Sequence, residues 1–150
     1  MGCHGGAGVT TLASLGLGHD GGRVPNWPVV PALPAGVLLV ARLSAAGMRA
    51  AGEAIEVWLS GKAPPGLHLF GLLVVAAGPG RRVPEVARDR LELVTGWLVN
   101  DIQATVQRRL WRIPWVDELL GLDYDLVRTC QPLIDAIPDD LKRWLLGRTR

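Results

Sequence analysis

The sequence predicts a small three-layer α/β/α domain with a mostly parallel sheet, and three observations support this prediction. Residues 36–41 (GVLLVA) and 71–77 (GLLVVAA) are short, continuous runs rich in valine and leucine, which is typical of strands covered on both faces. Each run is followed by a segment with the periodicity of an amphipathic helix. A third apolar segment, residues 109–116 (RLWRIPWV), indicates a strand that ends at Pro114, and it completes the alternation typical of βαβ units.

The helices are expected after each of the first two strands and near the end of the chain. In residues 45–61 apolar side chains recur every three or four positions, and Ser60-Gly61 provides a stop signal. The predicted buried face of this helix consists of Met48, Ala51, Ile55, Trp58 and Leu59. The next helix starts at Pro84, a residue favoured at the first helical position, and its predicted buried face consists of Ala87, Leu91, Val94, Leu98 and Ile102. A last helix is expected near Pro138, with Leu141, Trp144 and Leu145 on its apolar face.

Composition bounds the class of protein. A chain of 150 residues, with 49% hydrophobic and 20% charged residues, has the size and balance of one globular domain. Its net charge of +2 is too small to indicate a nucleic-acid partner by itself. Among the acidic residues only Asp20 precedes Glu53, whereas Arg23, Arg42 and Arg49 lie in the same third of the chain. We therefore expect this third to suit an anion, with no acidic group near the loop described next.

A glycine-rich loop, residues 4–11 (HGGAGVTT), is the main candidate site. Glycines allow backbone amides to turn inward and surround phosphate oxygens, and a following hydroxyl can hold magnesium. The candidate phosphate- or nucleotide-binding residues are Gly5, Gly6, Ala7, Gly8, Val9, Thr10 and Thr11. Thr10 is also the candidate metal ligand if a magnesium nucleotide binds. Val9 stands where a phosphate-binding loop usually has lysine.

The string HGGAGVTTLA resembles the deviant Walker A loop of the ParA/MinD-type P-loop ATPases, Lys-Gly-Gly-x-Gly-Lys-Thr-Thr-Leu-Ala. His4 and Val9 replace its two lysines. The pattern is also similar to a ParA-like family of GC-rich bacteria across residues 3–13, 37–51, 71–84 and 111–116. The resemblance implies a degenerate P-loop NTPase-like domain over residues 1–120, with a C-terminal helical tail, residues 121–150, packed on it.

The departures from this pattern predict a pseudo-ATPase. The strand at residues 36–41 is followed by Arg42 instead of the metal-site aspartate, and Ala76-Ala77 replaces the base-reading asparagine. Only the backbone amides and Thr10 carry over from the family pattern. We expect a binding or assembly module, on a plasmid or another mobile element, with weak or no nucleotide binding and no enzyme activity. The resemblance further implies a homodimer or another protein partner.

Two alternative functions stay open at this point. The first is a genuine ATPase that binds ATP or ADP with magnesium and takes its missing lysine from a partner subunit. The second is a nucleic-acid-binding protein that uses residues 107–115 (QRRLWRIPW), where arginines alternate with tryptophans that could stack on bases.

Other residues are secondary candidates for anion binding, nucleophilic chemistry or metal binding. Arg81 and Arg82 follow a predicted strand, on the edge of the sheet where ligands of α/β proteins bind, and they are secondary anion candidates. Cys3 could act as a nucleophile assisted by His4 or His19 if a thiolate formed there. No cysteine or histidine pair has zinc-ligand spacing. The two cysteines, the absence of a basic leader and apolar runs shorter than the roughly 20 residues of a spanning helix predict a cytoplasmic protein.

The strand that should precede the loop has too few residues to form. Only Met1-Gly2-Cys3 precede His4, so we expect the first strand to be lacking or truncated. An empty position beside an apolar strand would expose backbone donors and acceptors. We therefore expect upstream residues or a partner to supply that strand, and the segment MGCHGG to be mobile without it.

Overall fold

Three parallel strands form the middle layer of the structure, a computed structural model that describes residues 1–27, 35–80, 82–100 and 109–146. The strands are β1 (Ala35–Leu43), β2 (Leu67–Ala76) and β3 (Arg109–Ile113), in the order β1-β2-β3. Val40 of β1 pairs with Leu73 of β2, and Leu73 pairs with Trp111 of β3. All three predicted strands are therefore present, and all three are parallel as the alternation of strands and helices indicated.

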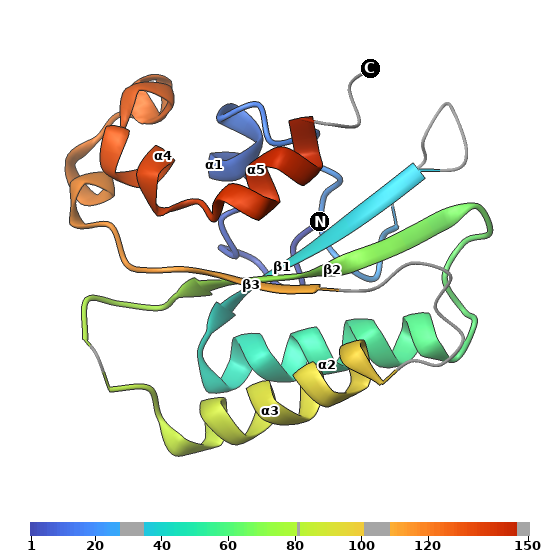
Figure 1. Ribbon diagram of the computed structural model, residues 1–150. Helices are drawn as coiled ribbons and strands as arrows, with labels where there is room; N and C mark the ends of the chain where they lie inside the picture. The colour runs from blue at the N-terminus through green and yellow to red at the C-terminus, as the bar shows by residue number, and fades with distance from the viewer. Residues whose placement is uncertain (28–34, 81, 101–108, 147–150) are drawn as a thin grey trace.

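Helices cover both faces of this sheet (Figure 1). Helices α2 (Ala45–Leu59) and α3 (Glu85–Val99) lie on one face, and α1 (Val9–Ser14), α4 (Gln131–Ala136) and α5 (Asp139–Leu146) lie on the other. Two 3-10 helices, η1 (Asp117–Gly121) and η2 (Tyr124–Thr129), connect β3 to α4. The predicted three-layer α/β/α architecture is confirmed.

The predicted helix faces are largely correct. Met48, Ala51 and Ile55 of α2 are buried, and so are Ala87, Leu91, Val94 and Leu98 of α3. Leu59 was expected on the buried face of α2 but is 43% exposed, because it is the last residue of that helix and lies beyond the sheet contact. Ile102 lies outside the described residues.

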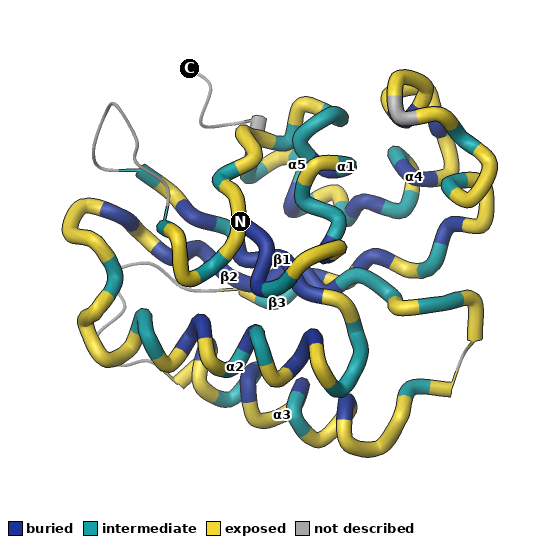
Figure 2. The backbone as a smooth tube through the Cα atoms, turned by 180° about the vertical axis from the view of Figure 1, so that it is seen from behind, coloured by how far each residue is buried: buried dark blue, intermediate teal, exposed yellow. Residues whose placement is uncertain are grey.

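The sheet separates two hydrophobic clusters, and Figure 2 shows buried residues in dark blue along the sheet and in the helices on both sides of it. On the side of α2 and α3, Met48 and Ile55 pack with Leu39 and Leu72 of the sheet. On the other side, Leu12 of α1 and Leu141 of α5 pack in one cluster with the sheet residues Val40, Leu73 and Trp111. Residues of the ranges 1–120 and 121–150 thus share this second cluster. The segment after residue 120 and α1 therefore together form the layer on this face of the sheet.

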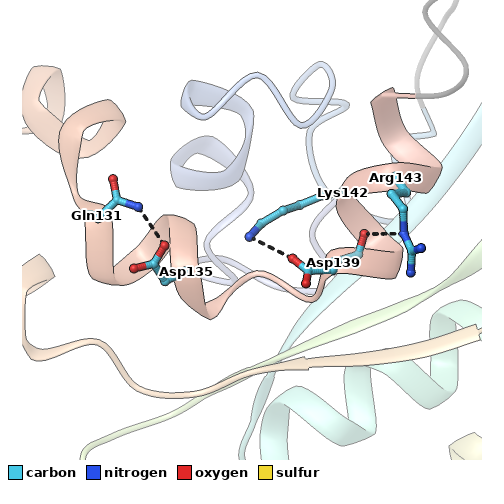
Figure 3. Close-up of polar contacts among 5 residues, drawn as sticks. All are labelled: Gln131, Asp135, Asp139, Lys142 and Arg143. Carbon is cyan, nitrogen blue, oxygen red and sulfur yellow. Dashed lines mark hydrogen bonds and ion pairs between the residues drawn. The ribbon is translucent and has the colours of Figure 1, made fainter.

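Polar side chains on the surface of this C-terminal segment form hydrogen bonds and an ion pair with neighbouring residues of the same segment (Figure 3). The Gln131 side-chain amide donates to the Asp135 carboxylate at 2.7 Å, and Lys142 Nζ lies 3.5 Å from Asp139 Oδ1. Arg143 Nε donates to the Asp139 carbonyl oxygen at 3.4 Å. Exposed contacts of this type contribute little to stability, so burial of Leu133, Ile137 and Leu141 holds the segment on the sheet.

The sheet position before the glycine loop is occupied by residues 1–3. Gly2 forms parallel bridges with Val40 on one side and with Arg23 on the other. The Val40 amide donates to the Met1 carbonyl at 2.8 Å, and the Cys3 amide donates to the Val40 carbonyl at 2.9 Å. The expectation of an empty position beside this apolar strand is therefore wrong at Val40 of β1, because residues 1–3 pair there. Three residues are enough to fill this position because the backbone of Val40 forms hydrogen bonds with both Met1 and Cys3.

Gly71 provides a stability test of the sheet. A β-carbon on Gly71 would collide with the Arg109 carbonyl oxygen of β3, a backbone atom that has no room to move. We expect Gly71→Ala to lower the free energy of unfolding by about 1–3 kcal/mol, the usual cost of overpacking. Urea unfolding followed by circular dichroism measures it.

Gly52→Ala is the matched control. A β-carbon on Gly52 would meet Trp97 at 3.5 Å, an ordinary contact, and alanine favours the helix by about 0.5–1 kcal/mol. Equal stability of the two variants would contradict the close approach of β2 and β3.

Candidate anion-binding site

The glycine loop joins the short strand position of residues 1–3 to helix α1. Because Gly2 is parallel to Val40, the chain leaves Cys3 at the same end of the sheet at which β1 ends. Gly6 and Gly8 have φ angles of 72° and 95°, in the left-handed region that favours glycine. These two turns return the chain to α1, whose Leu12 packs on the sheet. The predicted loop and the helix after it are thus present, and the chain before the loop pairs with β1 through an isolated bridge at Gly2 rather than through a full strand.

Several amide groups of the loop are free to bind an anion. The N–H groups of Gly5, Gly6 and Gly8 meet no hydrogen-bond acceptor within the part of the chain that the structure describes. Gly5 and Gly6 are exposed, and Gly8 is half-buried. Consecutive amides of this kind in a glycine-rich turn form an anion-binding concavity in many proteins.

Arg42, at the end of β1, brings a positive charge to this loop. Its Nε donates to the Gly6 carbonyl oxygen at 2.7 Å, and its backbone N–H donates to His4 Nε2 at 3.1 Å. His4 Nδ1 lies 2.8 Å from the Gly5 carbonyl, so both contacts of the ring are satisfied when its proton is on Nδ1. A β-carbon on Gly47 would collide with the Arg42 carbonyl oxygen, so only glycine allows α2 to begin this close to the site.

In the sequence Arg42 is one of three arginines in a part of the chain with few carboxylates, and it stands where a metal-site aspartate is expected. The structure makes it the cation nearest the loop carbonyls, with its two Nη groups free of partners among the described residues. No local signal distinguished it from Arg23 and Arg49, because its contact with Gly6 depends on the tertiary path of the chain. Arg23 adds to the same charge, because its Nη1 lies 3.7 Å from where a β-carbon of Gly5 would be.

The candidate residues at the start of α1 point in different directions. Val9 packs against Gly2 and lies in the wall of a cavity of about 490 Å³ on the side of residues 18–21, away from Arg42. Thr10 Oγ1 donates to Asp20 Oδ2 at 2.8 Å, while Asp20 Oδ1 accepts from the Gly22 amide. The expectation that no acidic group lies near the loop is therefore wrong, because the chain after α1 turns back and brings Asp20 to Thr10.

Thr11 lies in the wall of a second cavity, of about 350 Å³, at the carboxyl end of the sheet. Ala7 and Gly8 of the loop, Arg42 of β1 and Ala76 of β2 share this wall with Thr11. The opposite wall comes from the segment after β3 and includes Trp115, Val116 and Leu120. We call this space the edge cavity. It places the loop and Arg42 beside a partly open cavity at the carboxyl end of the strands, where ligands of parallel α/β sheets bind.

The other sequence candidates do not meet at this site. Arg81 lies outside the described residues, and Arg82 is exposed and lines neither cavity. Trp111, proposed to stack on bases, is 4% exposed and donates its indole N–H to Asp140 at 2.8 Å. This hydrogen bond holds the pKa of Asp140 below its usual value, with Arg109 at 3.5 Å adding to the effect. Trp111 is therefore a core residue.

Cys3 is placed badly for nucleophilic chemistry. Burial raises the pKa of its thiol to about 12, so the thiolate is strongly disfavoured. Neither His4 nor His19 makes a hydrogen bond to it in the described structure. Across the described ranges, no group of three or more His, Cys, Asp or Glu side chains is arranged to hold a metal ion.

Comparisons with known proteins identify no similar protein. A scan against protein-family models, a search of curated proteins and a search of solved structures each find no match. None of the helices in the described residues is long and apolar enough to cross a membrane.

The buried thiol gives a chemical test of the loop's anchor. At pH 8 a thiol with a pKa of about 12 holds roughly a thousandfold less thiolate than one at 9.0, so we expect iodoacetamide to alkylate Cys3 only through unfolding. Mass spectrometry of digested samples reads Cys3 and Cys130 separately, and urea-unfolded protein is the control. Alkylation of native Cys3 at the rate of a free thiol would restore the nucleophile hypothesis.

The same shift sets a direction for stability against pH. Because the folded thiol keeps its proton up to about pH 12 while the unfolded thiol loses it from about pH 9, stability falls as pH rises through this window.

Proposed function

We propose that this chain is a degenerate relative of the ParA/MinD-type P-loop ATPases, a binding or assembly module that holds the phosphate group of its ligand and does not hydrolyse ATP. The observation that carries the proposal is the placement of free loop amides and the Arg42 guanidinium at the carboxyl end of a parallel sheet. The pairing of Gly2 beside β1, followed by the glycine loop and α1, supports the family resemblance. The presence on a plasmid or mobile element and a cytoplasmic location belong to the same proposal.

Binding is supported by charge-assisted hydrogen bonds. A guanidinium to phosphate contact contributes roughly 1.5–3 kcal/mol, which offsets one of the two lysines replaced by His4 and Val9. Arg42 is exposed, so water and salt weaken this contact. One guanidinium with a few amides is therefore matched to a single phosphate group better than to the charge of a triphosphate.

Hydrolysis is not supported by the same geometry. Transfer of a phosphoryl group depends on cations that neutralise developing charge, usually including a magnesium ion held by a carboxylate and a hydroxyl. Arg42 stands at the end of β1 where that carboxylate is expected, and its positive charge repels a divalent cation. Thr10, the expected hydroxyl, donates to Asp20 on the far side of α1 from the edge cavity.

A role in assembly is supported by one helix face. Val86, Leu93 and Trp97 of α3 are 51%, 53% and 36% exposed, and their spacings of seven and four residues put them on one stripe. An exposed apolar stripe of this kind is a feature of surfaces that bind protein partners. A homodimer or another protein partner is the corresponding part of the proposal.

The first test concerns hydrolysis. We expect purified protein with ATP and magnesium to release no phosphate above a buffer blank, because the described site holds no cation besides its arginines. A coupled phosphate-release assay measures this. Turnover that is lost in Thr10→Ala would show a working ATPase and reject the pseudo-ATPase proposal.

The second test concerns phosphate binding. Titration of ¹⁵N-labelled protein with ADP should shift the amide resonances of Gly5, Gly6 and Gly8 at millimolar concentration. We expect Arg42→Ala to weaken this binding by about tenfold or more, since a charge-assisted contact is lost.

Arg49→Ala is the matched control for that titration. Arg49 is an exposed arginine of α2 whose guanidinium lies 3.8 Å from Glu53, outside the edge cavity, and its removal changes the net charge equally. An equal loss of affinity in both variants would mean that ADP senses overall charge and not this site.

A further inference from the structure

The edge cavity has one polar end and a wall that is otherwise mainly apolar. At one end lie Gly8, Thr11 and Arg42, which supply a free amide, a hydroxyl and a guanidinium. Most of the rest of the wall is formed by residues of β3 and the segment after it, among them Ile113, Pro114 and Val116, and the apolar residues Leu12, Val75 and Ala76 complete it.

Polar side chains are scarce over the apolar part of this wall. Trp115 carries one indole N–H there, and it already donates to Asp117 at 2.6 Å. Thr11 and Arg42 are the other lining side chains with hydrogen-bonding groups, and both lie at the loop end. A nucleobase or ribose in the cavity would leave its polar edges without side-chain partners, which costs free energy.

We infer that the edge cavity binds an anionic amphiphile, a ligand with one phosphate or carboxylate head group at Arg42 and the Gly8 end of the loop and an apolar body among the residues after β3. This inference rests on the proposed anion-binding role of the loop and names its ligand class. Charge complementarity supplies the head contact, since among the lining residues Arg42 alone carries a full charge. A volume of about 350 Å³ lies in the range of small-ligand sites.

Leu120 supports the choice of an apolar body. It is 75% exposed at the cavity wall, the most exposed large apolar side chain among the described residues. Leu119 and Leu122 line the same wall. An apolar chain in the cavity would cover these side chains and remove them from water, which favours binding in proportion to the apolar area buried.

The experiment compares four probes by isothermal titration calorimetry: decyl phosphate, decanoate, decanol and adenosine monophosphate. We expect decyl phosphate or decanoate to bind at least tenfold more tightly than decanol and than adenosine monophosphate. The phosphate and carboxylate arms identify the head group. Adenosine monophosphate binding as tightly as both amphiphiles would overturn the inference.

Two variant pairs locate the ligand. Ala76→Phe fills the cavity from the end of β2, whereas Ala77→Phe adds the same ring at the next, exposed position that does not line it. We expect a loss of at least tenfold in the first and none in the second, with thermal unfolding showing that both fold. Arg42→Ala should weaken the anionic amphiphiles about tenfold and leave decanol unchanged.

The surface variants keep the test valid if Ala76→Phe fails to fold. Leu120→Ser removes an exposed leucine from the cavity wall, and Leu126→Ser removes one that is 49% exposed on η2 and outside it. We expect a several-fold loss for Leu120→Ser alone. Equal effects of the two substitutions would overturn the inference.

The outcomes separate this inference from the proposed function. Shifts of the Gly5, Gly6 and Gly8 amides with ADP, but no preference for amphiphiles, would overturn the inference and leave phosphate binding in place. Amphiphile binding that does not depend on Arg42, together with no shift of the loop amides by ADP, would overturn both.

Discussion

Two backbone hydrogen bonds, one from the Val40 amide to the Met1 carbonyl and one from the Cys3 amide to the Val40 carbonyl, hold the glycine loop at the carboxyl end of the sheet. They fix where the chain turns, because the loop begins at the residue after Cys3. Gly22 and Val24 bond to Gly2 from the other side, so this short stretch is held between two neighbours. Arg42 reaches the Gly6 carbonyl oxygen because Val40 and Arg42 belong to the same strand, two residues apart. The site is thus a consequence of one parallel register.

The charge at the end of β1 determines which ligands this loop can accept. A carboxylate at position 42 would attract a divalent cation and, through it, a polyphosphate. A guanidinium does the opposite, since it repels the cation and contacts the anion directly. Its Nε is used on the Gly6 carbonyl, which turns the charge toward the loop. The Thr10 hydroxyl, the other group expected to hold magnesium, likewise has a different contact, since it donates to Asp20.

The strands and the two long helices could be predicted because their signals are local. Residues 36–41 and 71–77 lack any polar side chain, and α2 and α3 repeat their apolar residues with helical spacing. The contacts of the site could not be predicted in this way. Asp20 reaches Thr10 across ten residues, and Arg42 reaches Gly6 across thirty-six, so both contacts depend on the tertiary path of the chain. The pairing of Gly2 was missed for a related reason, since three residues carry no periodicity.

The segment after β3 has the same dependence on tertiary structure, and it connects the fold to the site. Leu133 belongs to the core cluster that holds α4 on the sheet and also lines the edge cavity. The apolar wall of the cavity is therefore continuous with the core, so it is held in place by burial elsewhere. Arg42, by contrast, is exposed, and solvent screens its attraction for an anion. Affinity at such a site has to come mainly from the wall, while the guanidinium and the loop amides set the orientation of the charged end.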